Sequence, residues 1–145
     1  MDDDGISQVA ALIITLLISA YFSASETAFL NYNTSSMKNL ASNNKKAALV
    51  LRLEDNYDNL MSTVLIFNNI ANIAAASLAI FIFSKMFVNN GIVFSTLIAI
   101  LLILILGELF PKGLADIYPD KTAMILAPSM KYFVDRKSTR LNSSH

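Results

Sequence analysis

Three long apolar runs decide what this chain can fold into. They cover Ile6–Leu30, Leu60–Phe83 and Ile92–Leu106, and Glu26 is the only charged residue inside them. A helix that crosses a hydrocarbon core of ~30 Å needs about 20 residues, because each residue adds ~1.5 Å. The first two runs are long enough as they stand. The third reaches this length if its helix continues past Glu108.

The pattern predicts an all-α membrane protein. A soluble three-helix core would show polar stripes at helical spacing, which these runs lack. We therefore expect three transmembrane helices, at about 6–30, 60–84 and 92–115.

Two amphipathic stretches flank the predicted spans. At about 34–55, apolar residues recur at threes and fours between Lys and Asn, which predicts one amphipathic helix or two short ones broken near residues 42–44. At about 120–134 we expect a further amphipathic segment, interrupted at Pro128, at the inner face of the membrane. Both suit the membrane surface, although the first is equally typical of a plain connecting helix.

The distribution of basic residues predicts the orientation. The connection between the first two spans holds four basic residues and the second connection holds only Lys85. The positive-inside rule then places the N-terminus outside and the C-terminus in the cytoplasm, for a multi-pass protein of the plasma (inner) membrane. The four basic residues are Lys38, Lys45, Lys46 and Arg52.

Composition excludes several classes of function. The chain of 145 residues has no cysteine, its one histidine is the last residue, and its formal net charge is zero. Thiolate, imidazole and zinc chemistry and nucleic-acid binding therefore have no basis, and we expect no enzyme. Residues 1–134 form one predicted domain. The polar end 135–145, "DRKSTRLNSSH", is interpreted as a non-native, adaptor-derived tail, the alternative being a disordered native one.

Polar residues interrupt the first two spans. Ser23 and Glu26 share a helix face, with Ser25 between them. In the second span, Asn68 and Asn72 are four residues apart and also share a face. That face continues through small residues, which permit close helix packing within or between subunits. These residues are Ala75, Ala76 and Ala79.

The third span ends in "GELFPK". Pro111 has no N–H, and its ring clashes with the carbonyl four residues back, that of Gly107. We therefore predict a helix break at Pro111 and an unpaired Gly107 carbonyl beside the Glu108 carboxylate. Irregular backbone at membrane depth is tolerated only in a protein interior or a wet cavity.

Together these groups offer hydroxyl, amide, carbonyl and carboxylate oxygens. This set suits a hard cation, Mg²⁺ above all, and neither zinc nor copper. Three alternatives remain open. The Ser and Asn side chains also serve as interhelical hydrogen-bond partners, Glu108 also suits an ion pair with Lys112, and Glu26 also suits the cytoplasmic end of its span.

At these residues the sequence resembles a known family. "FSASETAFL", "STVLIFNNIANIAAA" and "GELFPK" are similar to the membrane domain shared by bacterial CorC proteins and animal cyclin M (CNNM) transporters, from about Ala10 to Val134. The resemblance implies Mg²⁺ transport, as export in exchange for Na⁺. It also implies a homodimer in the lipid bilayer, a juxtamembrane belt helix beginning at about 120–134, and a following CBS-pair cytoplasmic domain that is absent from this sequence.

Carried over residue by residue, the resemblance implies a dehydrated Mg²⁺ between the helices. The implied ligands are Ser23, Asn68, the Gly107 carbonyl and Glu108. Ser25, Glu26 and Asn72 are second-rank candidates, as ligands, Na⁺-site groups or supporting groups. The alternative function is a non-transporting membrane anchor or Mg²⁺-sensing module for the missing cytoplasmic domain.

Overall fold

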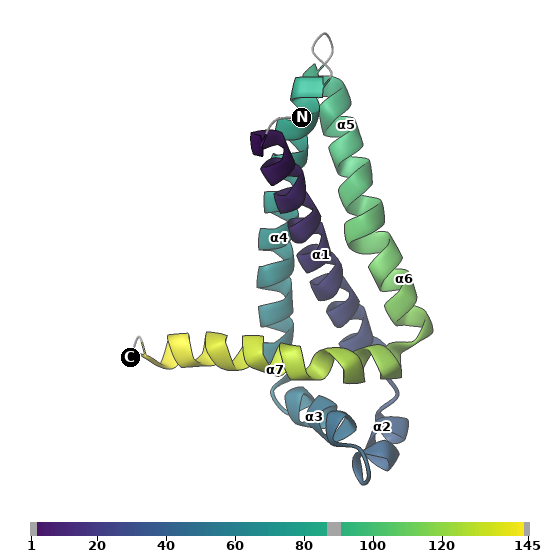
Figure 1. The fold of residues 1–145 in the computed structure, drawn as a ribbon. Coiled ribbons are helices and arrows are strands. Elements are labelled where there is room, and N and C mark those ends of the chain that lie inside the picture. The colour runs from purple at the N-terminus through teal and green to yellow at the C-terminus, as the bar shows by residue number, and fades with distance from the viewer. Residues whose placement is uncertain (1–2, 87–90, 144–145) are drawn as a thin grey trace. The chain divides into compact units, whose positions relative to one another are not determined.

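The computed structural model describes residues 3–86 and 91–143, and this part of the chain is helical with no strand (Figure 1). Three helical stretches are long and apolar enough to cross a membrane, namely Asp4–Asn31, Tyr57–Lys85 and Ile92–Ile117. The all-α class and the three spans are therefore confirmed. Each span runs slightly beyond its predicted limits at one or both ends, because the helices continue into polar residues.

The helices follow one another closely along the chain. In order they are α1 (Asp3–Asn31), α2 (Thr34–Ala41), α3 (Lys45–Glu54), α4 (Tyr57–Met86), α5 (Gly91–Leu102), the π-helix η1 (Ile103–Leu109), α6 (Phe110–Ile117) and α7 (Pro119–Ser143). They divide into two compact units. The first unit is Met1–Ser23 with Phe67–Pro111, and the second is Ala24–Ile66 with Lys112–His145.

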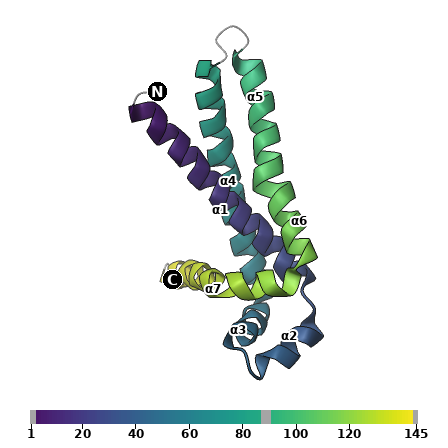
Figure 2. The same cartoon turned by 45° about the vertical axis from the view of Figure 1, so that its right-hand side comes forward.

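Small side chains let the helices of the first unit approach closely. Ala75 and Ala79 of α4 are fully buried against Leu12 of α1 and Ala99 of α5. Here α4 and α5 run side by side in opposite directions (Figure 2). Ala76 is half-buried. The predicted small-residue face therefore packs within the chain, and the large apolar side chains of these helices point outward, as in a lipid environment.

The second unit holds the two short helices that precede the second span. The Asn33 side chain accepts the N–H of Ser36 and so caps α2, and the Asn44 side chain accepts the N–H groups of Lys46 and Ala47 and caps α3. The segment 34–55 is thus two helices, as in the second of the two predicted arrangements. Figures 1 and 2 show α3 lying against α7.

The predicted interruption at Pro128 is wrong, since α7 is continuous from Pro119 to Ser143. A proline inside a helix removes one backbone hydrogen bond, here to the carbonyl of Met124. Buried residues on both sides of Pro128, among them Ala127 and Met130, hold the helix in place. Packing therefore overrides the local preference of the proline.

A buried phenol links the end of the first span to α3. Tyr32 is only 8% exposed, and its hydroxyl donates a hydrogen bond to the Glu54 carboxylate. Burial, followed by the hydrogen bond and the negative charge of Glu54, raises the pKa of Tyr32 well above its ordinary value. The neutral phenol is therefore the form that the fold stabilises.

Replacing this phenol should destabilise the protein. Hydrogen bonds to charged groups contribute about 1.5–3 kcal/mol, so we expect Tyr32→Phe to lower the free energy of unfolding by roughly that amount. The folded-state pKa is raised, so this stabilisation is complete below the ordinary value of about 10 and is lost as pH rises through the folded-state value. Denaturation in detergent across pH 7–11 measures both effects. Tyr57→Phe, at an exposed tyrosine, is the control. Equal stability of the two variants would contradict the assignment.

Candidate functional site

Polar side chains from three helices meet inside the first unit. Each helix contributes two residues, and the serine and asparagine pairs are each four residues apart, so each pair shares one helix face. The residues are Ser19 and Ser23 on α1, Asn68 and Asn72 on α4, and Gly107 and Glu108 in η1. All six lie within candidate membrane spans.

One hydrogen-bonded chain joins all three helices. The Ser19 hydroxyl donates to Asn72 Oδ1, and the Asn72 Nδ2 group donates to Glu108 Oε1 at 3.0 Å. The Ser19 hydroxyl also lies 3.4 Å from the Gly107 carbonyl oxygen. Glu108 and Asn72 are half-buried, while Ser19 and Gly107 are buried. The carboxylate is thus held by a neutral amide.

A second contact lies one helical turn along α1 and α4. The Ser23 hydroxyl donates to Asn68 Oδ1 at 3.2 Å, and both side chains are buried. One turn is about 5.4 Å, so the Ser23–Asn68 and Ser19–Asn72 pairs form consecutive layers between the two helices. The predicted ligands Ser23 and Asn68 are therefore in contact, in the layer next to the one that contains Glu108.

One hydroxyl of the cluster faces two hydrogen-bond acceptors. Ser19 has a single hydroxyl hydrogen, which faces both Asn72 Oδ1 and the Gly107 carbonyl. The Glu108 carboxylate only accepts. Among the described residues, no group of three His, Cys, Asp or Glu side chains is placed to hold a metal. Any cation here would be held by one carboxylate and several neutral oxygens.

The backbone around Glu108 departs from α geometry before the proline. Residues Ile103–Leu109 form a π-helix, in which the Phe110 N–H bonds to the Ile105 carbonyl five residues back. Pro111 then follows inside α6, so the predicted helix break at Pro111 is wrong. The wider turn lies directly before Pro111, and the helix continues through the proline to Ile117. Single π-turns are frequent at functional sites.

Gly107 lets η1 approach α1 closely. A Cβ atom added at this glycine would lie 3.0 Å from Ser19 Oγ and 3.6 Å from Ser19 Cβ. Any side chain here would push against the hydroxyl that bridges Asn72 and the Gly107 carbonyl. The constraint at this glycine is therefore the space beside Ser19 and not its backbone conformation, since its φ is not positive.

Two further candidates, Ser25 and Glu26, follow Ser23 in the sequence. Ser25 is buried and Glu26 half-buried, and both belong to the second unit. Glu26 Oε2 lies 3.5 Å from Lys112 Nζ. Glu108 itself accepts a hydrogen bond from Asn72, and its alternative pairing with Lys112 stays a prediction.

Ser19 was missed by the sequence analysis. It lies four residues before Ser23, just as Asn68 lies four before Asn72, so the same spacing on both helices was the available signal. The polar residues around Glu26 are the more conspicuous feature of the same run. Asn72, only a second-rank candidate, bridges Ser19 and Glu108 directly.

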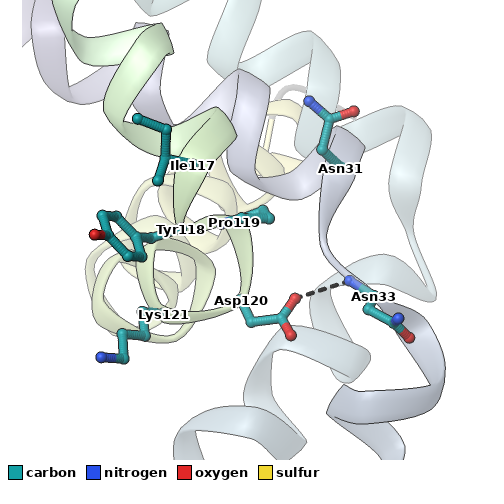
Figure 3. A pocket seen from close by; sticks show the side chains of 7 residues that line it. All are labelled: Asn31, Asn33, Ile117, Tyr118, Pro119, Asp120 and Lys121. Carbon is teal, nitrogen blue, oxygen red and sulfur yellow. Dashed lines mark hydrogen bonds between the residues drawn. The ribbon is translucent and has the colours of Figure 1, made fainter.

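A separate open cavity of about 300 Å³ lies within the second unit, where the end of α1 meets the start of α7 (Figure 3). Its Asp120 carboxylate accepts the backbone N–H of Asn33 at 2.8 Å, so this acid joins two segments of backbone. The cavity contains none of the predicted site residues. It is lined by Asn31, Asn33, Ile117, Tyr118, Pro119, Asp120 and Lys121.

Comparison with known proteins agrees with the resemblance. The family model of the cyclin M transmembrane N-terminal domain matches residues 10–134, which include all six residues of the cluster. The chain belongs to this family. It is therefore a cyclin M-type membrane domain, a class that fits its three candidate spans.

Curated relatives of this cyclin M-type domain are longer bacterial proteins. It is 35% identical over 127 residues to a UPF0053 protein of Haemophilus influenzae, covering 84% of this chain and 30% of the relative. It is 35% identical over 116 residues to the UPF0053 inner membrane protein YfjD of Escherichia coli, covering 77% of this chain and 27% of the relative. It is 28% identical over 126 residues to the UPF0053 protein sll1254 of Synechocystis, covering 86% of this chain and 36% of the relative. The chain thus spans about a third of the length of these relatives.

Two glycine substitutions should have opposite effects. Gly107→Ala forces Ser19 aside, and overpacking of this kind typically destabilises by about 1–3 kcal/mol. Gly113→Ala meets nothing within 4 Å and should stabilise the helix by roughly 0.4–1 kcal/mol. Melting temperatures in detergent compare the two variants. A Gly107→Ala protein as stable as Gly113→Ala would contradict the close contact between η1 and Ser19.

Proposed function

We propose that this domain carries Mg²⁺ across the membrane through the polar cluster of α1, α4 and η1. The observation that carries the proposal is a half-buried carboxylate, Glu108, within a candidate span, held by Asn72 in a cluster of neutral oxygens. Ionisable groups inside membrane segments are functional sites by default, because their burial is expensive.

The donor set favours Mg²⁺. This ion prefers six oxygen ligands in octahedral geometry, and the cluster offers six oxygen-bearing residues without nitrogen or sulfur donors in competition. In this proposal the hydroxyls, amide oxygens and Gly107 carbonyl replace hydration water, and Glu108 supplies the negative charge. The candidate ligands are Ser19, Ser23, Asn68, Asn72, the Gly107 carbonyl and Glu108.

The direction of transport and the coupling ion come from the family resemblance. In this proposal Mg²⁺ leaves the cell in exchange for Na⁺, which the same neutral oxygens suit. The working protein is a homodimer in the plasma membrane with a cytoplasmic CBS-pair domain. The longer relatives have room for such a domain, because the chain covers 27–36% of their length.

Removing the Glu108 charge tests the site without a flux assay. A ligand that binds only the folded state stabilises it by about 2.7 kcal/mol at 100 times its Kd. We expect Mg²⁺ to raise the melting temperature of the detergent-solubilised chain at constant ionic strength, and Glu108→Gln to remove most of that rise. Asp58→Asn, at an exposed acid in the first turn of α4, is the matched control and should respond as the wild type does.

Two results would contradict this proposal. An equal Mg²⁺ response in Glu108→Gln and the wild type would remove Glu108 from the site. A wild type that Mg²⁺ does not stabilise would leave the cluster as interhelical hydrogen bonding alone. If Mg²⁺ binds but the full-length protein gives no Mg²⁺ flux in proteoliposomes, the Mg²⁺-sensing module becomes the better account.

A further inference from the structure

The open cavity of the second unit lies where two candidate membrane spans end. The first span ends at Asn31 and the third at Ile117, and both residues line the cavity. The Asn31 Nδ2 group donates to Asp116 Oδ1 at 3.3 Å, so the two ends are joined within one unit. The ends of membrane spans meet the headgroup layer of a bilayer. The cavity therefore belongs at the depth of lipid headgroups.

The lining of the cavity carries both signs of charge. Asp120 is half-buried and Lys121 is exposed. In Figure 3 the side chains of Lys121 and Tyr118 extend to one side and the Asp120 carboxylate to the other. Asp120 Oδ1 accepts the Asn33 N–H at 2.8 Å, and a carboxylate has about four lone-pair sites, so it can accept further hydrogen bonds. The lining thus offers an acceptor for a cation and separate donors for an anion.

Apolar surface stands beside these charges. Ile117 and Tyr118 are 67% and 58% exposed, and both line the cavity. Tyrosine is enriched where a membrane meets water, because its ring suits the apolar side and its hydroxyl the polar side. A cavity of about 300 Å³ has room for a headgroup, while acyl chains would lie outside it along the apolar residues. A lipid therefore matches this combination better than a wholly polar ligand does.

We propose that this cavity binds the headgroup of a zwitterionic phospholipid with a primary ammonium, as in phosphatidylethanolamine. The ammonium donates to the Asp120 carboxylate, and the phosphate accepts from Lys121 and the Tyr118 hydroxyl. The acyl chains lie along Ile117. A purely anionic headgroup suits the cavity less well, because Asp120 lines it and Asp116 contacts its lining. This lipid site does not depend on the proposed Mg²⁺ transport.

Methylation of the ammonium tests the headgroup contact directly. Phosphatidylethanolamine and phosphatidylcholine with the same acyl chains share the phosphate, but the choline group has no N–H to donate. Titrations of the melting temperature with each lipid, for the chain in detergent without Mg²⁺, give the two affinities. We expect phosphatidylethanolamine to bind roughly fivefold more tightly, as one charge-assisted hydrogen bond near the surface would give.

Two substitutions separate the two ends of the headgroup. Asp120→Asn keeps an oxygen that can accept the Asn33 N–H but removes the charge, so it should abolish the preference for phosphatidylethanolamine. Lys121→Met should weaken both lipids by a similar factor, because both carry the phosphate. Asp58→Asn and Lys131→Met, at exposed residues, are the matched controls and should bind as the wild type does.

Several results would overturn the inference. Equal binding of the two lipids by the wild type would show that the ammonium is not recognised, and a preference kept in Asp120→Asn would place the ammonium elsewhere. Tighter binding of phosphatidylglycerol would indicate simple attraction of an anion. Equal stabilisation by glycerophosphoethanolamine, which has no acyl chains, would indicate a soluble ligand. If Asp120→Asn yields too little folded protein, Lys121→Met decides alone, and unchanged binding of both lipids would contradict the site.

Discussion

The close approach of η1 to α1 at Gly107 is the constraint on which the candidate site depends. Gly107 has only a hydrogen in place of a side chain, so the two helices approach closely there. The Gly107 carbonyl oxygen lies 3.4 Å from the Ser19 hydroxyl. The π-helix lies in the same segment, directly before Pro111, and the helix then continues to Ile117. Together they place Glu108 against the Asn72 amide. The small-residue contacts of Ala75 and Ala79 serve the same purpose one or two turns further along α4, where they let the helices pack closely.

Most of the fold could be predicted from hydropathy and capping, which are local signals. The three spans follow from uncharged runs that only a membrane or a large core can accommodate. The break between α2 and α3 follows from Asn44, whose side chain caps α3. Pro128 misled the prediction because the sequence shows only the backbone hydrogen bond that a proline removes from a helix. Whether the helix continues past the proline depends on how α7 packs. The π-helix was equally beyond local rules, since a shift of hydrogen bonds to five residues depends on how the segment packs against α1.

The sequence predicts that the candidate site is built of oxygen-bearing groups. It predicts only some of the residues that the structure brings together. Polar groups in apolar runs marked the three clusters, and the family resemblance selected Ser23, Asn68, Gly107 and Glu108 among them. Ser19 was missed because one serine in a membrane helix carries little signal before its partner is known. Glu26 looked like a member of the cluster by sequence distance, but its contact is with Lys112. Side-chain pairing between distant helices therefore decided which polar residues meet.

In the proposed function, one cation is held by the oxygens around Glu108. Anomalous diffraction from crystals of the chain grown with Mn²⁺ tests this most directly, because Mn²⁺ shares the preference for oxygen ligands and scatters anomalously. The account predicts one strong peak within coordination distance of the Glu108 carboxylate and the Gly107 carbonyl, and its loss in Glu108→Gln. A peak only at exposed carboxylates such as Asp58, or an equal peak in both proteins, would contradict it.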